Sequence, residues 1–264
     1  MGKLDGKTIW ITGASSGIGE ALAYALDKRS CKLILSSRKI VELERVKANC
    51  LKPENIKIIT LDLANLTDID AKTKMALAAF GTIDVLINNA GISQRSQIID
   101  TDISVYKKLM DINYLGTVAL TKSLLPHLIE TKKGHVVTVS SLMGKFAGPQ
   151  RSGYCGSKHA LHGFFDALRL EHEKDGLTVT MVCPGYVRTN IDKNALTADG
   201  SPQNKQDLEN QSGLAPGRLA EKMIKGITHK KFEMYIGGKE TLGVYLKRFF
   251  PRLLHRVVLR SIRK

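Results

Sequence analysis

A glycine-rich turn near the N-terminus constrains the fold more strongly than any other feature of the sequence. An apolar run over residues 7–12 leads directly into Gly13-Ala14-Ser15-Ser16-Gly17-Ile18-Gly19, and a helical pattern follows over residues 21–28. A strand, a glycine-rich turn and a helix in this order are typical of a dinucleotide site. Glycine lets the backbone approach phosphate, and a helix N-terminus attracts negative charge. The spacing is G-x-x-x-G-x-G, and a glycine cluster taken alone is also compatible with an ordinary turn.

Short apolar runs alternate with longer helical stretches along the whole chain. This alternation predicts βαβ units and a parallel sheet with helices on both faces. The chain has 264 residues, of which 43% are hydrophobic, so it can form one domain with one sizeable core. Neither an internal repeat nor a linker divides it. The seven expected strands lie at residues 7–12, 32–36, 56–61, 84–88, 134–140, 178–183 and 233–236.

Ser141, Tyr154 and Lys158 form a candidate proton-transfer group. Tyr154 and Lys158 stand four residues apart, so they share one face of a helix. A free tyrosine has a pKa of about 10. We expect the neighbouring ammonium to lower that pKa towards the range in which acid–base catalysis is efficient. With Ser141 holding a substrate oxygen, the group predicts proton transfer to or from an alcohol or carbonyl oxygen.

The end of the second expected strand carries Arg38 and Lys39 but no carboxylate. At this position of a dinucleotide-binding fold, an acidic residue accepts hydrogen bonds from a ribose 2′-hydroxyl, whereas a basic residue holds a 2′-phosphate. The sequence therefore favours NADP(H) as the cofactor over NAD(H). The alternative is that both side chains are merely the solvated start of the next helix.

Together with Asn88-Asn89-Ala90-Gly91, Asn113 and Pro184-Gly185, these motifs resemble those of the short-chain dehydrogenase/reductase family. The resemblance covers essentially the whole chain, and the motifs occur in the family's order. It implies an α/β fold, a Rossmann-like doubly wound sheet of seven parallel strands in a single domain. A C-terminal helical extension follows that domain.

The resemblance also implies roles for individual residues. Tyr154 would be the acid/base, and Ser141 would position the substrate oxygen. Lys158 would bind the nicotinamide ribose and lower the tyrosine pKa, and Asn113 would hold a water in a proton relay. The residues expected to bind the cofactor are Gly13, Ser15, Ser16, Gly17, Ile18, Gly19, Arg38, Asp62, Leu63, Asn89, Ala90, Gly91, Tyr154, Lys158, Pro184, Gly185, Val187 and Thr189.

The expected activity is that of an NADP(H)-dependent carbonyl reductase or alcohol dehydrogenase. Met143, Phe146 and Tyr186 are expected to contact the substrate beside Ser141 and Tyr154. They favour a largely apolar ketone or secondary alcohol, such as a steroid, a retinoid or a lipid-like carbonyl compound. Two alternatives stay open: a 3-oxoacyl thioester reductase, and a protein that senses NADP(H) without catalysis.

Two parts of the chain depart from a minimal dehydrogenase domain. The stretch 192–213 is polar and irregular, and we expect a substrate lid over about residues 186–216, with a disordered insertion as the alternative. The domain would span residues 1–238, and a tail would follow over residues 239–264. Residues 219–264, together with residues 194–201, resemble the dehydrogenase/reductase member 7 subgroup, especially its B-type members.

The formal net charge of +15 is concentrated near the C-terminus. Residues 218–264 hold thirteen Lys and Arg against three Glu. Within residues 241–264 basic residues recur every four positions among large apolar ones, and Pro251 suggests the start of a second, amphipathic helix. Such a helix suits peripheral contact with an anionic membrane. The alternative is a helix packed on its own domain or on a partner subunit. No motif supports nucleic-acid binding.

The remaining expectations concern location, metals and assembly. No secretory signal or membrane span is apparent, so we expect a cytoplasmic protein with its four cysteines reduced. Peripheral contact with a membrane is compatible with this location. His159 and His162 stand three residues apart, but no third metal ligand is evident, and no metal is expected. The family resemblance implies a homodimer or homotetramer, built on the helices that follow Asn113 and carry Tyr154.

Overall fold

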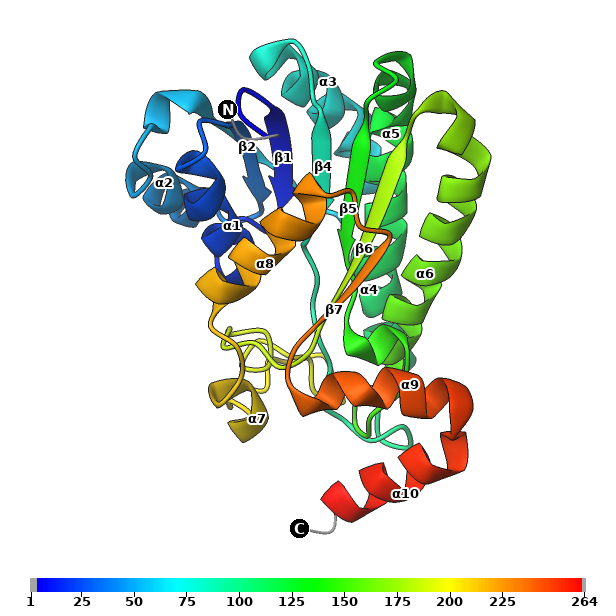
Figure 1. The fold of residues 1–264 in the computed structure, drawn as a ribbon. Helices are drawn as coiled ribbons and strands as arrows, with labels where there is room; N and C mark the ends of the chain where they lie inside the picture. The colour runs from blue at the N-terminus through cyan, green and yellow to red at the C-terminus, as the bar shows by residue number, and fades with distance from the viewer. Residues whose placement is uncertain (1–3, 263–264) are drawn as a thin grey trace.

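Seven parallel strands form one sheet in the order β3-β2-β1-β4-β5-β6-β7 (Figure 1). The structure, a computed structural model, describes residues 4–262, except the side chains of Glu209, Ser261 and Ile262. The strands are β1 (Thr8–Thr12), β2 (Lys32–Ser37), β3 (Ile56–Thr60), β4 (Val85–Asn88), β5 (His135–Val139), β6 (Thr178–Pro184) and β7 (Glu233–Ile236). The predicted Rossmann-like sheet is confirmed.

Helices cover both faces of the sheet (Figure 1). One face is covered by α1 (Gly17–Asp27), α2 (Ile40–Ala48) and α8 (Pro216–Thr228), and the other by α3 (Ile69–Phe80), α5 (Gly116–Glu130) and α6 (Ser152–His172). Helix α4 (Ile103–Met110) packs on α6 and continues through a π-helical turn, η3 (Asp111–Leu115), into α5. Short 3-10 turns lie at Pro53–Asn55, Leu66–Asp68, Leu142–Gly144, Glu173–Asp175 and Lys239–Thr241.

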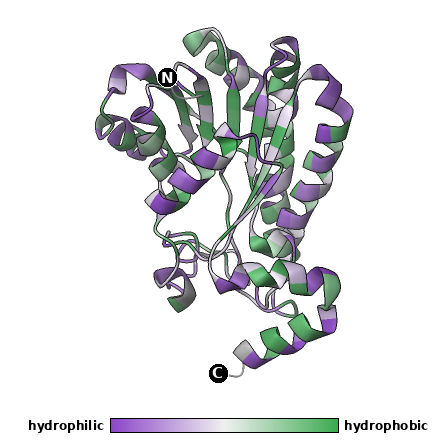
Figure 2. Cartoon of the chain, viewed as in Figure 1, coloured by the Kyte–Doolittle hydropathy of each residue, from purple (hydrophilic) through white to green (hydrophobic). Residues whose placement is uncertain are grey.

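The strand sequences explain why the sheet is covered on both faces. Every residue of β1, β4 and β5 is buried, as expected for strands of a parallel sheet between two helical layers. Figure 2 shows hydrophobic residues along the strands and hydrophilic residues on the outer surfaces of the helices. The one tryptophan, Trp10, is fully buried, and its indole N–H donates to Ser36 Oγ at 2.9 Å. This bond satisfies the polar atom that burial of the ring would otherwise leave unpaired.

The sheet order places a ligand crevice between β1 and β4. Successive strands run outward from β1 towards β3 in one direction and from β4 towards β7 in the other. In open α/β sheets, ligands bind beyond the carboxyl ends of the strands at such a reversal. Here those ends are Thr12 and Asn88, so the glycine-rich turn and the Asn-Asn-Ala-Gly motif meet at this point.

The expected lid segment, residues 186–216, packs on the domain. Asp192, Ala195 and Leu196 within it are buried. Isolated bridges pair Leu196 with Gln94, and Val187 with Leu214. A single short helix, α7 (Leu208–Gln211), lies near its end. The segment thus has defined contacts in the structure, while its movement as a lid stays a prediction.

The tail forms two helices, α9 (Leu242–Phe249) and α10 (Pro251–Ile262), and Pro251 begins the second helix as predicted. Leu254 is buried against Leu142 and Phe146 of the domain. Other large apolar side chains of the tail are exposed, among them Phe249, Phe250, Leu253 and Val257. Among the described residues, no helix is long and apolar enough to cross a membrane.

Candidate active site

The glycine-rich turn is held against the loop after β4. Gly13 has φ +66°, and a Cβ there would lie 2.8 Å from Ala90 Cα, so both backbone conformation and space require glycine. Asn89 Nδ2 donates to the carbonyl oxygens of Thr12 and Gly13, at 3.0 and 3.3 Å. Thr12 Oγ1 in turn accepts from the backbone N–H groups of Asn89 and Ala90. The two loops therefore form one rigid floor.

The first turn of α1 opens into a crevice above this floor, which we call the outer cavity. Helix α1 begins at Gly17, and the side chain of Ser16 makes no capping hydrogen bond to it. The first N–H groups of a helix lack intrahelical acceptors and favour an anion. The turn therefore fits a dinucleotide pyrophosphate.

Most of the expected cofactor residues line the outer cavity, including Ser15, Ile18, Arg38, Asp62, Leu63, Gly91 and Thr189. Gly19 lies behind the turn and does not line the cavity. A Cβ at this position would collide with the Gly13 carbonyl oxygen, so the turn requires glycine here. Pro184, Gly185 and Val187 line a second cavity together with Tyr154 and Lys158. The cavities adjoin, since Asn89, Gly91 and Thr189 line both.

The second cavity, here called the inner cavity, gathers every expected substrate residue. Its lining includes Ser141, Met143, Phe146, Tyr154 and Tyr186. Ser141 follows β5, and its hydroxyl accepts a hydrogen bond from Met143 N at 3.1 Å. Ser141 also hydrogen-bonds the Tyr154 side chain. The serine and the phenol therefore line one cavity.

Lys158 lies one turn after Tyr154 on α6. Its Nζ donates to the Val139 carbonyl oxygen at 2.9 Å and lies 5.8 Å from the centroid of the Tyr154 ring. Burial lowers the pKa of Lys158 to about 8. The predicted proximity of the two side chains is therefore confirmed.

The predicted pKa of Tyr154 is wrong in direction. Burial raises the pKa of the phenol, and the Ser141 hydrogen bond only partly opposes this rise. The Lys158 ammonium is bound to the Val139 carbonyl oxygen, and desolvation of the phenolate is the largest cause of the shift. The phenol is consequently held in its protonated, hydrogen-donating form.

Asn113 occupies the π-helical turn η3, a type of irregularity that is frequent at functional sites. Its Oδ1 accepts from Ile92 N at 2.8 Å, and its Nδ2 donates to Ile92 O and Ser157 Oγ at 2.9 and 3.0 Å. These bonds fix the loop after β4 to the helices behind it. The expected water-holding role of Asn113 stays a prediction.

Several polar residues of the inner cavity were not found from the sequence. They are Ser93, Arg95, Arg151, Asn210 and Glu240. Arg151 lies three residues before Tyr154, a helical spacing that could have revealed it. Glu240 lies in the C-terminal region, where its Oε1 accepts from Tyr186 N at 3.3 Å, and no local pattern marks such a contact.

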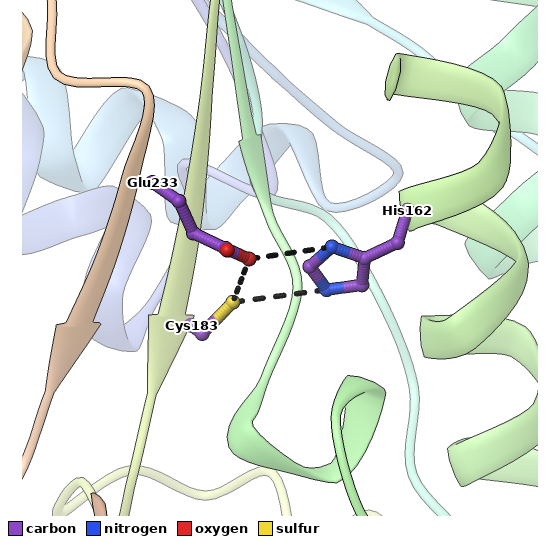
Figure 3. Close-up of side chains that lie close together, drawn as sticks. All are labelled: His162, Cys183 and Glu233. Carbon is purple, nitrogen blue, oxygen red and sulfur yellow. Dashed lines mark hydrogen bonds and ion pairs between the residues drawn. The ribbon is translucent and has the colours of Figure 1, made fainter. Parts of the chain in front are cut away.

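A buried polar cluster lies behind Lys158, one turn further along α6. His162 from α6, Cys183 from β6 and Glu233 from β7 converge (Figure 3). Cys183 Sγ lies 3.7 Å from His162 Nε2 and 3.5 Å from Glu233 Oε1. The sequence had suggested no third ligand for His162, and the structure supplies two neighbours with ligand atoms.

Charge balance explains this cluster without a metal ion. Lys145 Nζ lies 2.7 Å from Glu233 Oε1 and supplies a positive charge to the carboxylate. Tyr235 Oη donates to Glu233 Oε2 at 2.7 Å. Burial lowers the pKa of His162 to about 4, so the ring is neutral. The cluster thus connects β7 to α6, and the expectation of no metal stays a prediction.

Comparison with known proteins identifies the family. The family model for short chain dehydrogenases matches residues 7–200, which contain the glycine-rich turn and the Ser141, Tyr154 and Lys158 group. The chain belongs to the short-chain dehydrogenase family. This family consists of oxidoreductases that act on alcohol and carbonyl groups with a nicotinamide dinucleotide.

The short-chain dehydrogenase is similar to two curated groups of relatives. It is 43% identical to human dehydrogenase/reductase SDR family member 7 over 94% of this chain and 76% of that protein. It is 39% identical to mouse dehydrogenase/reductase SDR family member 7B over 96% of this chain and 80% of that protein. The predicted resemblance to the member 7 subgroup is confirmed.

A solved structure supports the fold independently. The crystal structure of a short-chain dehydrogenase/reductase from Burkholderia phymatum in complex with NAD superposes with a TM-score of 0.84. It covers 96% of both chains at 22% identity. At this identity the similarity establishes the fold.

Proposed function

We propose that this dehydrogenase is an NADP(H)-dependent carbonyl reductase of largely apolar ketones, such as steroid, retinoid or lipid-like carbonyl compounds. The observation that carries the proposal is the meeting of Ser141, Tyr154 and Lys158 in the inner cavity, beside the outer cavity that Arg38 lines. Leu142, Met143, Phe146 and Val187 give the inner cavity apolar walls.

The proposed reaction uses the protein as a proton donor. When bound, the nicotinamide supplies the hydride for the carbonyl carbon. Ser141 holds the carbonyl oxygen, and Tyr154 donates its phenolic proton to that oxygen as negative charge develops on it. The raised pKa of Tyr154 supports this assignment, because it keeps the phenol protonated near neutral pH and so favours reduction.

The preference for NADP(H) rests on the end of β2. Arg38 and Lys39 line the outer cavity next to Ser36 and Ser37, at the position where a ribose 2′-substituent is read. A guanidinium holds a phosphate through charge-assisted hydrogen bonds. Asp62 also lines the cavity, but it follows β3, and its Oδ1 accepts from Ala64 N at 3.0 Å.

The proposal extends to assembly and location. Proteins of this family commonly form oligomers, and we propose a homodimer or homotetramer built on α5 and α6. The exposed apolar and basic side chains of α9 and α10 support peripheral contact with an anionic membrane. All four cysteines are free and buried, which agrees with a cytoplasmic protein whose thiols stay reduced.

A ketone panel tests the proposed function. Apolar ketones of increasing size are supplied with NADPH or NADH, and absorbance of the reduced nicotinamide is followed at about 340 nm, with Tyr154→Phe as the inactive control. We expect reduction of several ketones, faster with NADPH. Reduction confined to 3-oxoacyl thioesters would favour the alternative enzyme. NADPH binding without turnover of any carbonyl compound would favour a sensor.

A further inference from the structure

Two arginine side chains lie together in the wall of the inner cavity, beside the reacting group. Arg95 comes from the loop after β4, and Arg151 immediately precedes α6. Their side chains are only 9% and 16% exposed. Both positive charges are close enough to lower the pKa of Tyr154 against the larger effect of burial. Two largely desolvated cations therefore border the place where a substrate is reduced.

A single carboxylate, that of Asp207 in the lid segment, accepts hydrogen bonds from both arginines. Arg95 Nε donates to Asp207 Oδ2 at 2.7 Å, and Arg95 Nη2 donates to the same oxygen. Arg151 Nη2 donates to that oxygen as well, at 3.1 Å. Three donors thus converge on one oxygen atom, and Asp207 carries one negative charge against two positive ones.

The two guanidinium groups differ in how fully they are satisfied. Arg95 Nη1 also donates to Ser93 Oγ and to the Gln94 carbonyl oxygen, at 3.2 and 2.7 Å, so Arg95 is fixed in place. Within the described part of the chain, the Arg151 guanidinium has one hydrogen-bond acceptor, Asp207 Oδ2. A guanidinium has five N–H donors. Arg151 therefore faces the cavity with donors to spare, and burying such donors without acceptors is costly.

Glu240, the acidic residue in the described lining of the cavity, does not balance this charge by direct contact. Glu240 Oε1 accepts backbone N–H bonds from Tyr186 and Gly238, at 3.3 and 3.0 Å. It is therefore held at the end of β6 and in the turn before α9. Met143 and Phe146 are among the apolar residues that line the cavity.

We propose that Arg151 and Arg95 form an anion subsite, and that the natural substrate is a carbonyl compound with an apolar body and a carboxylate. The inference rests on the proposed carbonyl reductase function and defines its substrate class. The substrate carboxylate takes up the free donors of Arg151 in a charge-assisted pair, while its carbonyl group lies at Ser141 and Tyr154. Asp207 competes with that carboxylate for the same two guanidinium groups.

Matched probes test the subsite: apolar oxo-carboxylic acids of increasing chain length, each with its uncharged methyl ester. The readout is the ratio of kcat/KM for acid over ester with NADPH, because a general change in catalysis cancels in this ratio.

We expect wild-type protein to prefer the acid. Arg151→Gln should lower the ratio roughly ten-fold or more. Asp207→Asn should raise it, because the internal competitor is gone. Arg29→Gln, which removes an exposed charge paired with Glu221, is the matched control and should keep the wild-type ratio.

The opposite signs separate recognition from a structural role. If the arginines only anchor the lid segment, Arg151→Gln and Asp207→Asn will change acid and ester reduction by the same factor, and the proposal falls. Ester reduction without a preference for the acid also overturns the subsite but leaves the carbonyl reductase function standing. Calorimetric titration with the acid gives a readout without turnover. If the wild-type protein binds the acid and Arg151→Gln binds it more weakly, the subsite is supported even if no ketone is reduced. If the wild-type protein neither binds nor reduces the acid, the proposal is overturned.

Discussion

The ring of Phe146 packs directly against Gly243, so the first tail helix supports the wall of the inner cavity. A Cβ on Gly243 would lie 2.8 Å from two ring carbons of Phe146. Phe146 and Leu142 belong to the same apolar cluster as Leu254 of α10. The tail is therefore part of the structure around the inner cavity, and changes in the tail can reach that cavity through Phe146.

Gly243→Ala should disturb substrate binding without disturbing the cofactor. The new methyl group must displace the Phe146 ring, which lines the inner cavity but not the outer one. We expect the KM for an apolar ketone to rise several-fold, with NADPH affinity unchanged by calorimetry. Gly217→Ala on α8 is the matched control, because a Cβ there has no atom within 4 Å among the described residues. Equal ketone kinetics in both variants would contradict the role of this contact.

Arg38→Ala should weaken NADPH binding by roughly ten-fold or more and leave NADH binding nearly unchanged, since one charge-assisted hydrogen bond to phosphate contributes about 1.5–3 kcal/mol. Arg38 is exposed and lines the outer cavity, so its replacement has little effect on folding. Arg29→Ala removes a charge outside that cavity and serves as control. Wild-type protein that binds NADH as tightly as NADPH would rule out the cofactor assignment.

The sequence predicted the parts of the site that lie close together along the chain. The Tyr154 and Lys158 pair follows from helical spacing, and the glycine-rich turn follows from its place between a strand and a helix. Contacts between distant segments carry no such pattern. Asp207 meets Arg95 across 112 residues, and Glu240 reaches Tyr186 across 54. These contacts depend on how the lid segment and the tail pack after the sheet has formed.

The pKa of Tyr154 shows a second limit of sequence reasoning. Spacing revealed the neighbouring charge of Lys158 but not the burial of both groups. Desolvation raises the phenol pKa and lowers the ammonium pKa, so each group approaches its neutral form. Only the packed structure shows that desolvation is the largest cause of both pKa shifts.

Tyr154→Phe and Lys158→Met should separate chemistry from cofactor binding. Tyr154→Phe should abolish ketone reduction and keep NADPH affinity, because it removes one hydroxyl and little volume. Lys158→Met should weaken both. In wild-type protein NADPH affinity should fall as the pH rises through about 8, where buried Lys158 loses its charge, and Lys158→Met should lack this step. Calorimetry over about pH 6.5–9 measures it, and the same step in Lys158→Met would refute the ribose-binding role.

Buried histidine makes the fold sensitive to acid. Burial lowers the pKa of His135 to about 4, and its Nε2 pairs with Thr180 Oγ1 at 2.8 Å. The unfolded chain takes up the proton near pH 6.5, whereas the folded protein resists it until about pH 4. The free energy of unfolding should therefore decrease as the pH falls through this window. His135→Gln should reduce the loss by about 3 kcal/mol, at about 1.4 kcal/mol per pKa unit.

Urea unfolding at several pH values measures this dependence. His229→Gln is the control, because His229 is exposed at the end of α8, where its Nδ1 meets the Lys225 carbonyl oxygen. We expect His229→Gln to follow the wild-type curve. A His135→Gln curve that is also parallel to wild type would show that His135 does not cause the acid sensitivity.

The tail should bind anionic vesicles through its exposed surface. Phe249 and Phe250 are 68% and 62% exposed, and Arg252 and Arg256 of α10 are exposed as well. Each basic residue near an anionic surface contributes about 1 kcal/mol, so replacing Arg252 and Arg256 together by Gln should weaken binding roughly thirty-fold. Co-sedimentation with vesicles measures this, and binding should weaken with salt as the Debye length shortens from about 8 Å at physiological ionic strength.

Leu254→Ala separates this surface from the structural face of the same helix. Leu254 is buried against Leu142 and Phe146, so its truncation should cost about 2–5 kcal/mol of stability and lower the melting temperature. The Arg252 and Arg256 double variant should melt like wild type, because both side chains are exposed. If the tail serves only to cover the domain, full-length protein will fail to bind anionic vesicles even at low salt, while Leu254→Ala will still be destabilised. The other outcome is that the wild-type protein binds vesicles and the double variant does not, although the double variant melts at the wild-type temperature. The two faces of α10 then have different tasks: one supports the wall behind Phe146, and the other holds the enzyme at a lipid surface.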